Sequence, residues 1–201
     1  MDGEWICLTC AQLMLVEVPN AQVLGTAPVL SLLPFEQPAV RALLHCLKYE
    51  GIAEAAPALV RACAARPGSR DLLLQGLDPF GKGLLLIPVP SAKITKRARG
   101  YAQAELLAQE LGTWLDAPVW PGALFRSKGG TQVGHSASRR KERVSDLFSW
   151  SGSDRLAAYE NRTWVVVDDV LTTGATLSAC LELVSLHGGA AHAGLTLAWK
   201  R

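Results

Sequence analysis

The densest group of chemically useful side chains in this sequence lies between residues 163 and 184. An apolar run rich in β-branched residues begins at Thr163, as is typical of a strand buried on both faces, and the adjacent carboxylates Asp168 and Asp169 follow where that strand is expected to end. A turn rich in hydroxyl groups occupies residues 172–176, after which apolar residues recur at helical spacing. The segment therefore predicts a strand, an acidic pair, a small-residue turn and a helix.

This turn has the properties of an anion site. The start of a helix exposes unpaired backbone N–H groups and the positive end of the helix dipole. Gly174 lets the backbone turn tightly and approach a ligand, and the neighbouring threonines add hydroxyl donors. Asp168 and Asp169 repel phosphate, but they can accept hydrogen bonds from sugar hydroxyls or hold a hydrated Mg²⁺. The pattern favours a sugar phosphate such as ribose 5-phosphate over an ordinary capped strand–turn–helix.

Residues 165–176 resemble the loop that binds phosphoribosyl pyrophosphate (PRPP) in type I phosphoribosyltransferases, with an apolar run, Asp-Asp and then Thr-Thr-Gly-x-Thr. Further stretches are similar to one branch of that family, the ComF competence proteins, and they are residues 47–51, 87–90, 99–108 and 132–148. Together the matching stretches span roughly residues 40–200.

The resemblance implies an α/β type I phosphoribosyltransferase fold, in which a mainly parallel twisted sheet carries helices on both faces. It also implies PRPP as the ligand, Mg²⁺ as the cofactor, and displacement of pyrophosphate from the ribose by an acceptor. On this basis the 5-phosphate is held by Thr172, Thr173, Gly174, Ala175 and Thr176. Asp168 and Asp169 hold the ribose hydroxyls and, through water, Mg²⁺. Pyrophosphate is neutralised by Lys48, Ser91, Arg97, Arg99 and Arg140. The catalytic candidates are Asp168, Asp169 and Arg140.

The same resemblance implies a link to DNA uptake during natural transformation, which residue chemistry alone does not reveal. The sequence leaves open whether catalysis is retained and which acceptor is used. The alternatives are a PRPP sensor and a competence factor that binds single-stranded DNA, acting with other competence-machinery proteins. Basic residues cluster within 93–99 and 126–143, which suits a polyanion. Tyr101 is the only aromatic residue in those loops, which weakens the single-strand alternative.

Composition places the chain among soluble globular proteins. Its 201 residues are 49% hydrophobic and 19% charged, and the formal net charge is only +2. No apolar run is long enough to span a bilayer and the N-terminus does not resemble a signal peptide, so we expect a cytoplasmic protein without membrane insertion. One α/β domain over residues 36–201 is predicted, preceded by a small irregular N-terminal appendage over residues 1–35.

The appendage contains half of a zinc knuckle. Cys7 and Cys10 form one C-x-x-C pair, and no second pair follows. A structural zinc site needs four ligands, so we expect no bound zinc. The remaining cysteines, Cys46, Cys63 and Cys180, lie in apolar helical patterns typical of small core residues, and the odd total of five argues against a disulfide framework.

Hydrophobic spacing predicts the remaining elements. Residues 20–35 are expected to be irregular, and residues 76–83 imitate a nucleotide-binding P-loop but precede an apolar run, so they are interpreted as a turn before a strand. Residues 127–147 are predicted to form a long mobile loop that closes over PRPP. Helices are predicted at 38–49, 52–65 and 102–114, and strands at 84–89, 119–125 and 192–199.

Overall fold

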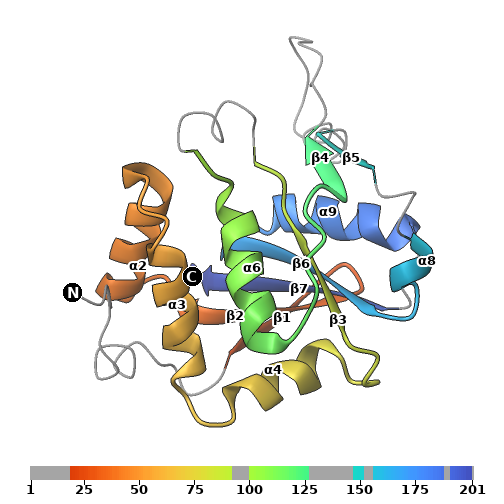
Figure 1. Ribbon diagram of the computed structural model, residues 1–201, viewed down its shortest axis with the longest axis horizontal. Helices are drawn as coiled ribbons and strands as arrows, with labels where there is room; N and C mark the ends of the chain where they lie inside the picture. The colour runs from red at the N-terminus through yellow and green to blue at the C-terminus, as the bar shows by residue number, and fades with distance from the viewer. Residues whose placement is uncertain (1–18, 92–99, 127–146, 152–155, 188–190, 201) are drawn as a thin grey trace.

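The main sheet combines strands from both ends of the chain (Figure 1). A computed structural model describes residues 19–91, 100–126, 147–151, 156–187 and 191–200. Within these ranges the strand order is β1-β2-β7-β6-β3. Their bounds are β1 (Asn20–Leu24), β2 (Ala27–Pro34), β3 (Leu84–Pro88), β6 (Thr163–Leu171) and β7 (Ala191–Trp199). Strand β1 is antiparallel to β2 and every other pair is parallel, so the predicted mainly parallel α/β sheet is confirmed.

The prediction that residues 20–35 are irregular is wrong. They form the β1–β2 hairpin, and β2 pairs in parallel with β7 from Val29↔Gly194 to Pro34↔Trp199. Local spacing concealed this because Pro28 and Pro34 punctuate the segment. Pro34 is the last residue of β2, where its missing N–H interrupts the ladder least.

Helices cover both faces of this sheet, as predicted. Their bounds are α2 (Pro38–His45), η1 (Cys46–Glu50), α3 (Ala55–Ala64), α4 (Ser69–Leu77), α6 (Gln103–Leu115), α8 (Leu156–Tyr159) and α9 (Ala175–Leu186). Successive side chains of a strand point to opposite faces. Val165 and Val167 of β6 accordingly pack with α2, α3, α4 and α6, whereas Trp164 and Val166 pack with α9. Figure 1 shows α6 and α9 on opposite sides of the sheet.

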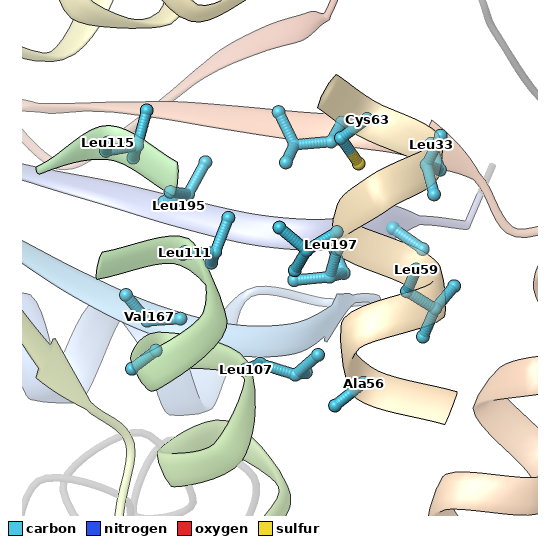
Figure 2. Packing of buried hydrophobic residues seen from close by; sticks show 14 of the residues in the cluster. Leu33, Ala56, Leu59, Cys63, Leu107, Leu111, Leu115, Val167, Leu195 and Leu197 are labelled. Carbon is cyan, nitrogen blue, oxygen red and sulfur yellow. The ribbon is translucent and has the colours of Figure 1, made fainter. Parts of the chain in front are cut away.

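The larger core lies between the sheet and the helices α3 and α6 (Figure 2). Leu59 of α3 and Leu107 and Leu111 of α6 are fully buried against Leu195 and Leu197 of β7. Because α6 is fixed on the sheet in this way, the residues at its first turn have a defined position relative to the strand ends. Within the described helices, none is long and apolar enough to cross a membrane.

Some elements differ from the prediction. The helix expected over 38–49 continues to Glu50 but becomes the π-helix η1 after His45. Of the strand expected at 119–125, the structure forms a bridge between Val119 and Leu86 and then β4 (Leu124–Arg126), which pairs with β5 (Phe148–Trp150) outside the main sheet. Helix α4 was missed in the sequence, although Leu73 and Leu77 show the spacing of a buried helical face.

The segment that imitates a P-loop is a turn before β3, as interpreted. The Asp78 carboxylate accepts hydrogen bonds from the backbone N–H groups of Lys82 and Gly83, at 3.1 and 2.6 Å. It also accepts one from the Thr163 hydroxyl at 2.8 Å, which ties the turn to the start of β6. The backbone donors of this turn are therefore used internally.

Candidate functional site

The acidic pair lies at the carboxyl-terminal part of β6. The strand was expected to end at the acidic pair. It continues instead through Asp168 and Asp169 to Leu171, and Asp168 is in register with Thr196 of β7. Both carboxylates are partly buried. Ligands of parallel α/β sheets bind at this edge, beyond the carboxyl ends of the strands. The pair is therefore held by strand pairing and does not belong to a loose connection.

The two carboxylates have different environments. Asp168 Oδ1 accepts a hydrogen bond from the Asp169 N–H at 2.9 Å, and Asp169 Oδ1 forms an ion pair with Lys48 Nζ at 2.9 Å. Burial, and then the negative charge of Asp169, raise the pKa of Asp168 to about 7, although the Asp169 N–H and Lys48 oppose that shift. A cation bound between the two carboxylates would remove the repulsion that raises this pKa.

The hydroxyl-rich turn connects β6 to α9, as the sequence predicts. Gly174 has φ of +73° and precedes the helix, and Ser178 N–H donates to its carbonyl at 2.8 Å. A Cβ at Gly174 would lie 3.0 Å from Leu24 Cδ1, so the β1–β2 hairpin closes in behind the turn. Thr172 and Thr173 are exposed. We name residues 168–176 the β6–α9 segment.

The start of α9 leaves backbone donors available to a ligand. The Thr173 hydroxyl accepts a long hydrogen bond from the Ala175 N–H at 3.4 Å. The first hydrogen bond to the helix backbone is the one from Ser178, so the amides before it have no intrahelical acceptor. Exposed hydroxyls beside free N–H groups at a helix N-terminus are the arrangement expected from the sequence for an anion site.

Lys48 reaches the acidic pair from η1. This π-helix ends at Gly51, which has φ of +71°. The side chain of Lys48 is 25% exposed and that of Asp169 is 13% exposed, so the ion pair is largely shielded from water. We name η1 together with Gly51 the Lys48 turn. The sequence suggested Lys48 as a pyrophosphate ligand, and the structure brings it to the carboxylates.

Ser91 lies just beyond the carboxyl end of β3, the strand next to β6. The Val89 N–H donates to the Val167 carbonyl at 2.8 Å, immediately before the acidic pair. An open cleft of about 430 Å³ lies at this strand end, and its lining includes Ser91, Glu105 and Phe125. The remaining predicted site residues lie outside the described part of the chain, and they are Cys7, Cys10, Arg97, Arg99 and Arg140, together with nearly all of the predicted loop 127–147.

The carboxylates fit a hydrated Mg²⁺ better than an all-protein metal site. Among the described residues, no group of three or more His, Cys, Asp or Glu side chains could hold a metal ion. Mg²⁺ keeps several waters and is commonly bound by one or two carboxylates together with substrate phosphates. One oxygen of Asp168 and one of Asp169 already have partners, which leaves a second oxygen on each for water-mediated contact.

Two residues that contact the Lys48 turn were not singled out as site residues from the sequence. Tyr101, two residues before α6, and Gln103, the first residue of α6, both donate hydrogen bonds to the Leu47 carbonyl in the Lys48 turn. They lie within residues 99–108, one of the stretches that carries the family resemblance, and that was the only signal for them. Their acceptor is more than 50 residues away, so spacing could not reveal it.

Comparison with known proteins supports the family resemblance. The chain is 40% identical over 104 residues to Competence protein F of Haemophilus influenzae, covering 51% of this chain and 44% of that protein. It is 32% identical over 160 residues to DNA utilization protein YhgH of Escherichia coli K12, covering 77% of this chain and 64% of that protein. No family model matches the chain.

The chain is therefore related to the ComF-type competence proteins. It matches about half to two thirds of the length of these relatives. Their names concern competence and DNA utilization. The type I phosphoribosyltransferase fold and activity, which the sequence resemblance implies, remain predictions.

Proposed function

We propose that the β6–α9 segment and Lys48 form a PRPP site that works with Mg²⁺, in a phosphoribosyltransferase-like protein linked to DNA uptake. One observation carries the proposal. Two partly buried carboxylates, one of them ion-paired to a lysine, lie directly before an exposed hydroxyl turn at a helix N-terminus. A ribose phosphate presents both hydroxyls and a phosphate in one small molecule, so it suits carboxylates and an anion-binding turn that follow each other in one segment.

Each group has a distinct task in this proposal. The turn at residues 172–176 binds the 5-phosphate through hydroxyls and backbone N–H groups. Asp168 and Asp169 accept hydrogen bonds from the ribose hydroxyls and hold water around Mg²⁺, which when bound supplies positive charge to the pyrophosphate. Lys48, released in part from Asp169, contacts a pyrophosphate oxygen. No covalent protein nucleophile is needed, since charge stabilisation of the leaving group is the main requirement.

Calorimetry with PRPP, in the presence and absence of Mg²⁺, tests the binding site. Saturable binding that strengthens with Mg²⁺ is expected, and ribose 5-phosphate is expected to bind more weakly because it lacks pyrophosphate. Absence of PRPP binding under both conditions contradicts the proposal. Release of pyrophosphate in the presence of candidate bases then separates a transferase from a sensor.

Single-stranded DNA is the second candidate ligand. The similarity to a DNA utilization protein favours it, and the structure adds an aromatic side chain that the sequence argument lacked. Tyr49 is 69% exposed and directly follows Lys48 in η1. Exposed aromatic rings beside cations bind single strands by stacking and charge. Tyr49→Ala should weaken binding of a short oligonucleotide while leaving PRPP affinity unchanged.

A further inference from the structure

The hydrogen bonding of the Lys48 turn leaves one buried carbonyl in need of donors. In an α-helix the Gly51 N–H donates to the Leu47 carbonyl, four residues earlier. Here the Gly51 N–H donates to Cys46 O, and the Ile52 N–H donates to the same atom at 3.2 Å. Because of this shift, the Leu47 carbonyl receives no hydrogen bond from Gly51. Leu47 is fully buried, so its carbonyl is not accessible to water. Buried carbonyls almost always have a hydrogen-bond partner.

Side chains at and just before the start of α6 supply those donors. The Tyr101 hydroxyl donates to Leu47 O at 2.8 Å, and Gln103 Nε2 donates to the same oxygen at 3.3 Å. Gln103 is only 8% exposed, which is unusual for a glutamine. A buried amide needs a hydrogen-bond partner, and the Leu47 carbonyl is one. The two donors thus replace the backbone bond that the π-helix gives up.

Helix α6 also fixes this contact relative to the acidic pair. Leu107 and Leu111 of α6 are buried in the same core as Val165 and Val167 of β6, the strand that carries Asp169. The Leu47 carbonyl and Asp169 are therefore tied to one rigid frame, and Lys48 is the residue between them. Its Nζ lies 2.9 Å from Asp169 Oδ1.

We propose that Tyr101 and Gln103 are positioning residues: through the Leu47 carbonyl they hold the π-helical turn that places Lys48 against Asp169. Neither side chain needs to touch a ligand for this role. The structural part of the inference stands on the contacts alone. Its consequence for ligand binding rests on the proposed PRPP site, where Lys48 contacts pyrophosphate.

Amine labelling of the free protein tests the structural part without any ligand. Acetic anhydride labels lysines according to the accessibility of Nζ, and Lys82, whose Nζ lies over the Phe80 ring, serves as the internal reference. The double variant Tyr101→Phe with Gln103→Leu should raise labelling of Lys48 several-fold and leave Lys82 unchanged. Tyr159→Phe, which removes a tyrosine hydroxyl elsewhere, is the matched control and should change neither.

Unchanged Lys48 labelling in a folded double variant overturns the inference. If the double variant does not fold, Tyr101→Phe alone, which removes one oxygen atom, is assessed in the same way. Circular dichroism establishes whether the double variant is folded. Equal increases at Lys48 and Lys82 indicate general loosening and also overturn it.

A double-mutant cycle on PRPP affinity tests the consequence. Tyr101→Phe should weaken PRPP–Mg²⁺ binding several-fold in the wild-type background and have no further effect in a Lys48→Met background, since the hydroxyl acts through Lys48. Equal losses in both backgrounds contradict positioning through Lys48. If the wild type binds no PRPP but the labelling result holds, the positioning inference stands and the proposed function fails.

Discussion

The two parts of the candidate site are built in different ways. The β6–α9 segment is continuous in sequence, and its shape depends on one strand, one glycine and the start of one helix. The Lys48 turn lies 121 residues before Asp169 and depends on side chains contributed by α6. The first part is specified locally and the second by tertiary contacts. Substitutions in the first should therefore act on the ligand directly, and substitutions around the second should act through the position of one amine.

Neutralising the acidic pair should have the largest effect on binding. Asp168→Asn combined with Asp169→Asn is expected to weaken PRPP–Mg²⁺ binding at least tenfold, or about 1.4 kcal/mol, because both charges that the proposed site uses to order Mg²⁺ are lost. Calorimetry measures the change, and Asp116→Asn, away from this strand end, is the matched control. A folded double variant with unchanged affinity contradicts the assignment of the site to the β6–α9 segment.

The next effect is a pH dependence of stability that belongs to the same segment. Burial and the charge of Asp169 raise the pKa of Asp168 from its ordinary value of 3.8 to about 7, so the native state binds this proton more tightly than the unfolded state. Its contribution to stability is therefore lost as pH rises from about 4 to about 7. The facing groups are Asp169, Lys48 and, from α9, Cys180.

Urea unfolding without Mg²⁺ or phosphate measures this contribution. Asp168→Asn removes the titrating group. The free energy of unfolding of this variant, relative to that of the wild type, should therefore increase from pH 4 to pH 7 and then stay constant. We expect a relative gain of more than about 1 kcal/mol, since one pKa unit corresponds to about 1.4 kcal/mol. A difference that does not change with pH would show that the Asp168 carboxyl is not desolvated as described.

One glycine in each part of the site has nearly the same φ, so alanine substitutions at these two positions allow a direct comparison of stability. Gly174 has φ of +73° and Gly51 has φ of +71°, so alanine is strained by about 1–2 kcal/mol at either position. At Gly174 the added Cβ also lies 3.0 Å from Leu24 Cδ1, whereas nothing lies within 4 Å at Gly51. Gly174→Ala should therefore lower the free energy of unfolding by roughly 1 kcal/mol more than Gly51→Ala. If urea unfolding shows equal losses of stability for the two variants, the Leu24 side chain moves away from the added Cβ without an energetic cost.

The smallest expected effect is the coupling between the two parts. Lys48→Met leaves the Asp169 carboxylate without its cation, and Asp169→Asn leaves Lys48 without its anion. The two losses should be non-additive by about 1 kcal/mol in the free energy of unfolding, because each single change already breaks the same pair. Additive losses, measured by denaturant titration, would mean that the ion pair does not stabilise the fold.

The sequence could predict the locally specified elements. The buried strand β3, the helices α6 and α9 and the hydroxyl turn were predicted because their spacing and glycines act over a few residues. The acidic pair lies near the carboxyl end of β6, as predicted, although β6 extends two residues past it. Strand pairing with β7 keeps residues 168–171 extended, and no local signal shows that partner.

Elements that depend on distant partners could not be predicted. The β1–β2 hairpin contains prolines and becomes part of the sheet only through β7. The helix predicted over 38–49 ends in the π-helix η1, whose shifted hydrogen bonding leaves the Leu47 carbonyl to accept from Tyr101 and Gln103. A pattern of apolar residues records burial, but it does not record which carbonyl a distant hydroxyl will bind.

The pairing of β2 with β7 has a consequence for how the chain folds. The Ser31 and Thr196 hydroxyls lie 2.7 Å apart in the sheet interior, yet 165 residues separate them in the sequence. Closing so long a loop costs chain entropy before the contact contributes any stability, so proteins rich in such contacts fold slowly. Until β7 arrives, the hairpin and the β3–β6 pair each present a strand edge without a neighbour. Such edges associate with other chains, and aggregation during refolding should therefore depend steeply on protein concentration.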